Sequence, residues 1–179
     1  MILVAYSSAH GSTAGIAERI ARRLRDWGHA AVASPVGAVD AVGRYEGVIL
    51  GSAIHNGAWL PEAETFARNQ AEALQGRPVW LFSVGSIGGE SSFFGVRTTR
   101  LIRRAQSRNA QLVEVRSLTG ARDHHGFAGA IQAGDWSKLG NLLLRAFGGR
   151  PGDHRNWAEV DAWADSIVNA LRSTPAAVA

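Results

Sequence analysis

The sequence of 179 residues has no cysteine, one methionine and a single lysine, Lys138. Without cysteine, the chain can form no disulfide, no thiolate metal site and no cysteine nucleophile. It contains no run of about 18 uncharged apolar residues, so no membrane-spanning helix is expected. Met1 leads directly into an apolar segment with no basic region before it, and we therefore expect no signal peptide. These absences favour a cytoplasmic protein.

The composition is that of an ordinary globular domain, with 46% hydrophobic residues. The length suits one domain with a sizeable core. We expect this domain to span residues 1–172 and to be followed by a flexible tail at 173–179. The net charge is +4, and a positive surface favours anionic partners such as an acidic substrate, nucleic acid or lipid headgroups.

Apolar runs of strand type alternate with segments of helical periodicity along the chain. This alternation predicts βαβ units, and hence five parallel strands with helices on both faces. The strands are expected at 2–6, 30–33, 47–51, 78–83 and 112–118, and the helices at 16–27, 61–75, 97–109, 136–147 and 157–171, with one short helical turn within 36–42. We expect all five strands to lie before about residue 119.

Three polar, glycine-containing loops follow the first, third and fourth predicted strands, at 7–13, 52–59 and 84–95. Ligands bind where the carboxyl ends of parallel strands meet. The first loop runs into a helix, whose unpaired N–H groups favour an anion. It has no lysine and no Gly-x-Gly-x-x-Gly spacing, which disfavours triphosphates and dinucleotides. A terminal monophosphate fits better.

The segment Ser8-Ala9-His10-Gly11-Ser12-Thr13 resembles the flavodoxin phosphate signature, with His10 in place of the usual Ser or Thr. In flavodoxin-like proteins this loop holds the ribityl phosphate of FMN, and the second and third loops flank the isoalloxazine ring. The resemblance covers the first 119 residues. It implies an α/β flavodoxin-like fold, a doubly wound sheet in strand order 2-1-3-4-5, here with extra C-terminal helices.

A narrower resemblance extends to the C-terminal part of the chain. It rests on Tyr6 to Ser8, Gly51 to His55, Phe82 to Val84, Leu142, Phe147 to Gly149, Asp153 to Arg155 and Trp157. Together these residues resemble the menaquinone-dependent protoporphyrinogen IX dehydrogenases, which are FMN enzymes that act at the membrane. The chain departs from them in the third loop, where the bacterial enzymes have a longer basic insert.

The resemblance implies a non-covalent FMN site formed by the three loops. The expected cofactor-binding residues are Ser8, His10, Gly11, Ser12 and Thr13 for the phosphate, and Ser52, Ala53, Ile54, His55, Asn56, Trp59, Val84, Gly85, Ser86 and Ile87 for the ring. Ser and Thr are also ordinary N-cap residues, so the first loop could be a simple helix cap. Trp59 could stack on the flavin or act as a staple at the next helix start. No catalytic acid or base is required, and His55 is the candidate if a proton carrier exists.

Three further segments have competing interpretations. His124 and His125 are adjacent, which puts them on opposite faces of extended chain, so we expect a polar loop and no shared metal site. The helix at 136–147, with basic residues near its ends, could lie on a membrane or pack across a sheet edge. The arginine face within 97–108 could attract propionates or headgroups, or simply face solvent.

The sequence therefore predicts an FMN-dependent oxidoreductase, quinone-linked and of dehydrogenase type, with a porphyrinogen as the candidate substrate. The alternatives are a flavodoxin-type electron carrier that docks to a redox-partner protein, and a non-catalytic flavin-binding module. Carriers of this class are acidic, so the charge of +4 favours the enzyme. We expect an anionic organic substrate, a quinone or a redox protein as partner, no nucleic acid and no metal. Contact with the inner face of the membrane is left open.

Overall fold

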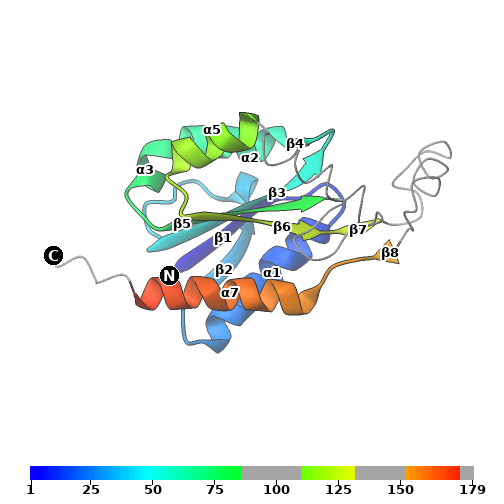
Figure 1. Ribbon diagram of the computed structural model, residues 1–179. Coiled ribbons are helices and arrows are strands. Elements are labelled where there is room, and N and C mark those ends of the chain that lie inside the picture. The colour runs from blue at the N-terminus through cyan, green and yellow to red at the C-terminus, as the bar shows by residue number, and fades with distance from the viewer. Residues whose placement is uncertain (86–109, 132–151, 174–179) are drawn as a thin grey trace.

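The computed structural model describes residues 1–85, 110–131 and 152–173. A parallel sheet in the order β2-β1-β3-β5-β6 forms its centre (Figure 1). Its strands are β1 (Ile2–Ser7), β2 (Ala31–Pro35), β3 (Gly47–His55), β5 (Val79–Gly85) and β6 (Asp123–Ala128). Counted along the chain as five parallel strands, this is the doubly wound order 2-1-3-4-5, so the predicted flavodoxin-like α/β fold is confirmed.

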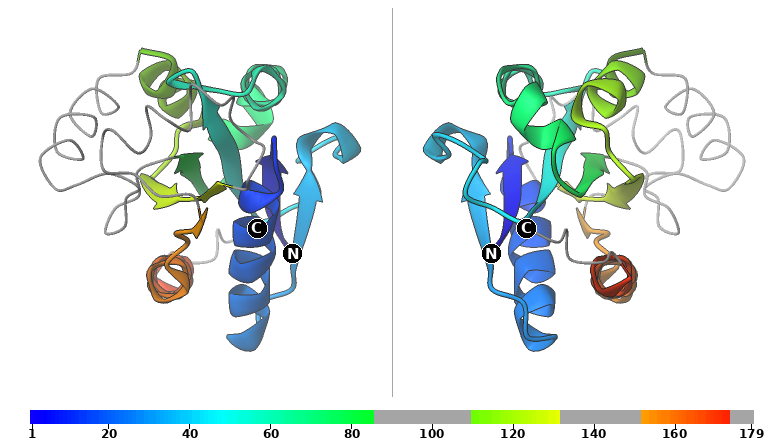
Figure 2. Two further views of the ribbon diagram at one scale, coloured as in Figure 1. Left: turned by 90° about the vertical axis from the view of Figure 1, so that its right-hand side faces the viewer. Right: turned by 90° about the vertical axis from the view of Figure 1, so that its left-hand side faces the viewer.

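Helices cover both faces of the sheet (Figures 1 and 2). One face carries α1 (Ser12–Asp26) and α7 (Trp157–Arg172), and the other carries α2 (Pro61–Asn69), α3 (Ala71–Gln75) and α5 (Ala110–Thr119). The shorter elements are the 3-10 helix η1 (Val36–Ala38) and the strands β4 (Ala58–Trp59), β7 (Ala130–Ile131) and β8 (Gly152–Asp153).

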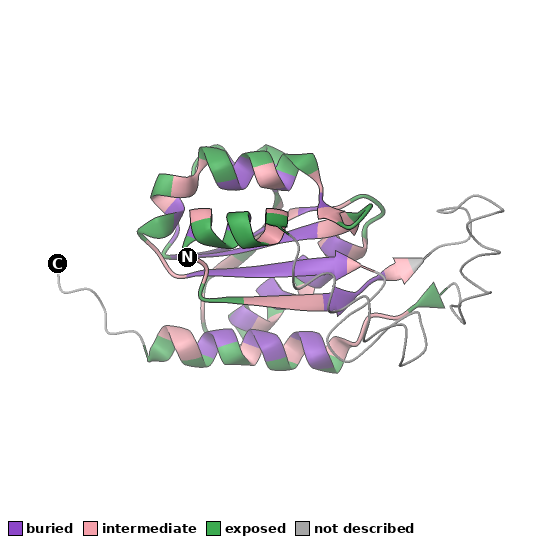
Figure 3. Ribbon diagram, turned by 45° about the horizontal axis from the view of Figure 1, so that its top comes forward, coloured by how far each residue is buried: buried purple, intermediate pink, exposed green. Residues whose placement is uncertain are grey.

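The strands are buried on both faces, whereas the helices expose one side to solvent (Figure 3). Alternate residues of the central strands point to opposite faces. Side chains such as Val4, Ile49 and Phe82 therefore pack against α1 and α7, while neighbours such as Leu50 and Leu81 pack against α2, α3 and α5. Two cores, one on each side of the sheet, thus hold the helices in place.

The pairing of α1 with α7 is reinforced by two bidentate ion pairs. Arg19 donates from Nε and Nη2 to the carboxylate of Asp161, at 2.7 and 2.6 Å. Arg23 makes the same contact with Asp165, at 2.7 and 2.9 Å. Fork-to-fork pairs of this kind are directional, so they fix the helices along their axes as well as holding them together.

The prediction for the fifth strand was wrong. Residues 112–118 belong to the helix α5, and the strand is β6, in the segment expected to be a polar loop. Leu112, Val115 and Leu118 recur every three residues, so they lie along one side of α5, and Val115 is buried there. β6 is paired only with β5 and keeps just Phe127 and Ala128 buried, which is why its sequence lacks an apolar run.

The helix predicted at 61–75 is divided between α2 and α3 at Gln70, whose ψ of 9° interrupts the helical path. The Gln70 side chain accepts a hydrogen bond from the Val42 N–H at 3.3 Å and donates to the Asp40 carbonyl at 3.2 Å. The helices predicted at 97–109 and 136–147 and the tail after residue 173 lie outside the described residues. Within the three described ranges, no helix is long and apolar enough to cross a membrane.

Candidate functional site

The three predicted loops leave the sheet at the same edge. Ser7 of β1 lies opposite Ser52 of β3, and Ser52 lies opposite Ser83 of β5. All three strands run in parallel, so the segments that follow them begin side by side. The topology thus brings together the first, second and third loops, as the sequence predicted.

The first loop turns sharply into α1 at Gly11. This residue is the N-cap of α1 and has a φ of 85°, a left-handed conformation that glycine adopts without steric cost. The Gly11 N–H donates to Ser8 Oγ at 3.0 Å, which closes the turn. Glycine provides no side chain to accept from the first N–H groups of the helix, which therefore suit an anion.

The predicted phosphate residues differ in exposure. Gly11 and its neighbour His10 are exposed, and Ser8 is partly buried, so all three can meet a ligand. Thr13 is buried, with only 1% of its surface exposed. Ser12 is partly buried, and its hydroxyl accepts from the Ala130 N–H at 3.0 Å and donates to the Ala130 carbonyl at 3.4 Å. Ser12 therefore links the first loop to β7.

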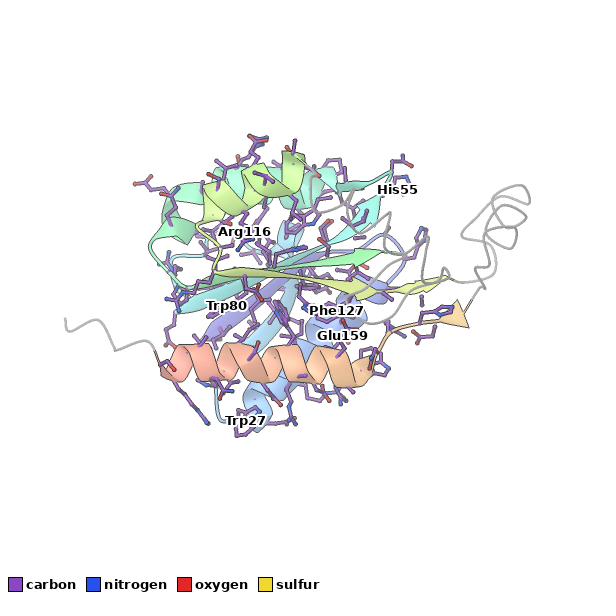
Figure 4. All side chains as sticks on the ribbon, viewed as in Figure 1. Trp27, His55, Trp80, Arg116, Phe127 and Glu159 are labelled. Carbon is purple, nitrogen blue, oxygen red and sulfur yellow. The ribbon has the colours of Figure 1, made fainter. Side chains whose placement is uncertain are left out.

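The second loop is a tight β-hairpin. Strands β3 and β4 pair in antiparallel register, with His55 opposite Ala58, which leaves a two-residue turn of Asn56 and Gly57. Both turn residues have positive φ, 51° and 80°, as a type I′ turn requires. His55 projects from the tip of this hairpin (Figure 4) and is exposed. The ring-binding segment of the prediction is thus an ordered ribbon.

Ser52 holds the base of this hairpin. It is fully buried, and its hydroxyl accepts from the Leu60 N–H at 3.0 Å and donates to the Ala53 carbonyl at 2.9 Å. Leu60 is the N-cap of α2. With its hydroxyl engaged in this way, Ser52 can face a ligand at this edge through its backbone.

Trp59 lies in the core on the α2 and α5 side of the sheet, with 3% of its surface exposed. Its backbone N–H donates to Gln111 Oε1 at 2.7 Å, and its indole Nε1 donates to Ser83 Oγ at 2.7 Å. This geometry supports the alternative in which Trp59 packs at the start of the helix. Stacking on a flavin stays a prediction.

A chain of polar side chains continues from Trp59 beneath the hairpin. Ser83 Oγ lies 2.8 Å from Nε2 of His124 on the neighbouring strand. Burial lowers the pKa of His124 from 6.5 to about 4, with the carboxylate of Asp123 opposing the shift. His124 is therefore neutral at physiological pH, which suits it to accept the Ser83 hydroxyl proton.

The third loop is described only at its beginning. Val84 is buried against the α1 and α7 side, with 4% of its surface exposed. Gly85 lies against Ile54, since a Cβ at Gly85 would be 3.4 Å from the Ile54 Cβ. The predicted residues Ser86 and Ile87 lie outside the described part of the chain.

His125 points to the opposite face of the sheet from His124. Its Nε2 lies 3.0 Å from Glu159 Oε1 on α7, and its ring is 4.6 Å from that of Phe127 (Figure 4). Within residues 1–85, 110–131 and 152–173, no group of three or more metal-binding side chains is present.

A segment from the C-terminal part of the chain also reaches the first loop. β7 and β8 pair in antiparallel register, with Ala130 opposite Asp153. The His154 N–H donates to the Gly129 carbonyl at 3.1 Å, next to the Ala130–Ser12 contact. Residues 129–131 and 152–155 therefore form a border of the site that the sequence did not predict, although the tail resemblance had included Asp153 to Arg155. The hairpin was also missed, and its Asn-Gly pair was the available signal.

Comparison with known proteins gives a family and a fold. A model of the flavodoxin domain family matches residues 3–136 of the chain. No protein of curated function matches it.

Three solved structures illustrate the similarity. Oxidised flavodoxin 2 from Bacillus cereus is 22% identical, with a TM-score of 0.59 over 94% of this chain and 98% of that one. A cysteine-to-serine mutant of flavodoxin from Pseudomonas aeruginosa is 12% identical, with a TM-score of 0.61 over 96% and 99%. Rubredoxin:oxygen oxidoreductase from Desulfovibrio gigas is 17% identical, with a TM-score of 0.60 over 96% of this chain but 36% of that one.

Proposed function

Because the chain belongs to the flavodoxin domain family, we propose that it binds FMN non-covalently at the edge formed by the loops after β1, β3 and β5. The observation that carries this proposal is the turn at Gly11. It presents the N-terminus of α1 beside the β3–β4 hairpin, with no lysine or arginine in the loop itself. This donor set fits a phosphate monoester rather than a magnesium-bound triphosphate.

The residues present divide the expected contacts between phosphate and ring. The first N–H groups of α1, with Ser8 and His10, would hold the phosphate. The backbone of Ser52 to Asn56 and the start of the third loop would border the ring. When bound, FMN supplies one- and two-electron redox chemistry. The protein's part is to orient the ring, to limit access of water, and to carry a proton at His55 if the reaction needs one.

Flavin binding is tested directly by the colour of the purified protein and by titration of the cofactor-free protein with FMN. His10→Glu places a carboxylate beside the phosphate, and we expect it to weaken FMN binding by about tenfold or more. His10→Gln is the matched neutral control and should bind within about threefold of the wild type. A colourless protein that takes up no added FMN would end this proposal.

We further propose that the protein is an enzyme that passes electrons from an organic donor, with a porphyrinogen as the candidate, to a quinone. The net charge of +4 supports an enzyme with an anionic substrate over an acidic carrier, as does the resemblance of the C-terminal segment to the protoporphyrinogen dehydrogenases. An electron carrier and a non-catalytic flavin module are the alternatives. The same charge would favour contact with an anionic membrane surface.

Anaerobic reduction of the bound flavin separates these possibilities. For a quinone-linked enzyme, menaquinone should reoxidise the reduced flavin faster than either oxygen or a ferredoxin-type protein does. For a carrier, the redox protein should be the faster acceptor. A non-catalytic module should show bound FMN and no turnover of protoporphyrinogen or any other donor. The quinone proposal fails if menaquinone is the slowest of the three acceptors.

A further inference from the structure

The loop that precedes α1 offers only weakly charged donors to a phosphate. It contains no lysine or arginine between Ser8 and Thr13, and its N-cap is a glycine. A phosphate monoester has close to two negative charges at neutral pH. The N-terminus of a helix contributes the equivalent of only about half a positive charge. A cation held near this turn would therefore favour a phosphorylated flavin strongly over an unphosphorylated one.

Arg155 brings a cation to this turn from the other end of the chain. Its Nη1 atom lies 2.7 Å from the position that a Cβ would occupy at Gly15, the fourth residue of α1. Glycine is a poor helix former in a helix interior. At position 15 its lack of a side chain leaves the space into which the guanidinium fits. β8 and the start of α7, which flank Arg155, lie at the same end of the sheet as the start of α1 (Figure 1).

The guanidinium is fixed before any ligand arrives. Nε and Nη2 donate to the two carboxylate oxygens of Asp153 at 2.8 and 2.6 Å, so Nη1 is the nitrogen that meets α1. The Arg155 Cζ lies 4.6 Å from the centre of the Trp157 ring. The backbone is also held, since the Arg155 N–H donates to Asp153 Oδ1 at 3.1 Å. A side chain ordered in this way loses little entropy when an anion binds beside it.

The carboxylate of Asp153 offsets this positive charge only in part. Its side chain is 47% exposed, whereas that of Arg155 is 22% exposed, so solvent screens the carboxylate more than the guanidinium. The hydrogen bonds from Arg155 lower the pKa of Asp153, which stays ionised at neutral pH. The two residues can thus be altered separately, with effects of opposite sign on a nearby anion.

We propose that Arg155 is a specificity-determining residue that sets the preference of the site for FMN over riboflavin, and that Gly15 is the residue that lets it do so. This inference rests on the proposed binding of FMN. It assigns to the C-terminal segment a part in cofactor recognition, through charge placed beside the first turn of α1.

The test is the ratio of the affinities for FMN and riboflavin, measured on the full-length, cofactor-free protein by quenching of flavin fluorescence. We expect Arg155→Gln to lower this ratio by about tenfold, almost entirely through weaker FMN binding. Asp153→Asn should raise the ratio by about threefold, because the guanidinium then acts without its counter-charge. Gly15→Ala should lower it, because a methyl group displaces the guanidinium. Added salt should reduce the wild-type ratio more than that of Arg155→Gln.

Arg23→Gln is the matched control. Arg23 also makes a bidentate pair between α1 and α7, with Asp165, but lies eight residues after Gly15. That places it about 12 Å further along the helix. We expect Arg23→Gln to leave the ratio unchanged, which separates loss of charge near the phosphate from loss of an ion pair between the helices.

Three results would decide the matter. An unchanged ratio in Arg155→Gln would overturn the inference while leaving FMN binding intact. If that variant does not fold, Arg155→Lys should keep the ratio within about threefold of the wild type, because it keeps the charge, and a tenfold loss there would also overturn it. A wild-type protein that binds neither flavin would defeat the proposed function itself.

Discussion

Acid should destabilise this protein through His124. The ring lies beneath the β3–β4 hairpin, 2.8 Å from Ser83 Oγ, and burial lowers its pKa from 6.5 to about 4. In the unfolded chain the same imidazole takes up a proton near its ordinary pKa. Between about pH 6.5 and pH 4, the unfolded state therefore binds more protons than the folded state, and the free energy of unfolding falls as the pH falls.

The size of this effect follows from the two pKa values. Between about pH 7.5 and pH 5, a histidine with these values lowers the free energy of unfolding by about 2 kcal/mol. Ordinary carboxylates remain mostly ionised over this range, so they add little to the change. Because whole domains are stable by only about 5–15 kcal/mol, the loss should be easy to measure.

The assay is urea unfolding of the cofactor-free protein, followed by tryptophan fluorescence at a series of pH values. His124→Gln keeps an amide that can accept from Ser83 but removes the titrating group. We expect its free energy of unfolding to fall by about 2 kcal/mol less than that of the wild type between about pH 7.5 and pH 5. His55→Gln, at the exposed hairpin tip, is the control and should follow the wild type. Parallel curves for His124→Gln and the wild type would refute the reasoning.

Three further predictions concern the packing of the sheet and of α7. Gly51→Ala should lower the free energy of unfolding by about 3 kcal/mol, because a Cβ there would overlap the ring of the buried Phe82; a loss below about 1 kcal/mol in urea unfolding would contradict this. Asn156→Ala should cost about 1 kcal/mol, since its side chain accepts from the Glu159 N–H at 3.2 Å as the N-cap of α7, and Asn156→Asp should restore most of the loss in the same assay. Asp165→Asn should lower the urea midpoint through its contacts with Arg23 and Trp27, and this effect should shrink at high salt; an effect independent of salt would argue against an ionic contribution.

The elements that sequence reasoning predicted are those whose burial leaves a periodic pattern. α1 buries Ile16, Ile20 and Leu24 at helical spacing, and the central strands are apolar on both faces because helices cover both. The same logic failed for β6 and α5. An edge strand needs few apolar residues, and the β-branched Val113 and Val115 of α5 favour a strand locally, whereas the packing of Val115 under the sheet favours a helix.

The candidate site shows the same limit. The convergence of the three loops could be predicted, because parallel topology alone puts the carboxyl ends of β1, β3 and β5 at one edge. The contact of Ser12 with Ala130, 118 residues later in the chain, and that of Gly15 with Arg155 could not. They depend on where β7, β8 and α7 return to the sheet, and no local pattern at Ser12 or Gly15 encodes that path.

The paired arginines and aspartates of α1 and α7 have a consequence for the position of the C-terminal segment. The arginines are four residues apart on α1, and their aspartate partners are four residues apart on α7. If α7 slid by one turn, Arg23 would meet Asp161 and one residue of each kind would lose its partner. The two rungs therefore act as a ruler that admits one axial setting, and Arg155, two residues before α7, is delivered to Gly15 by a measurement made further along the helices.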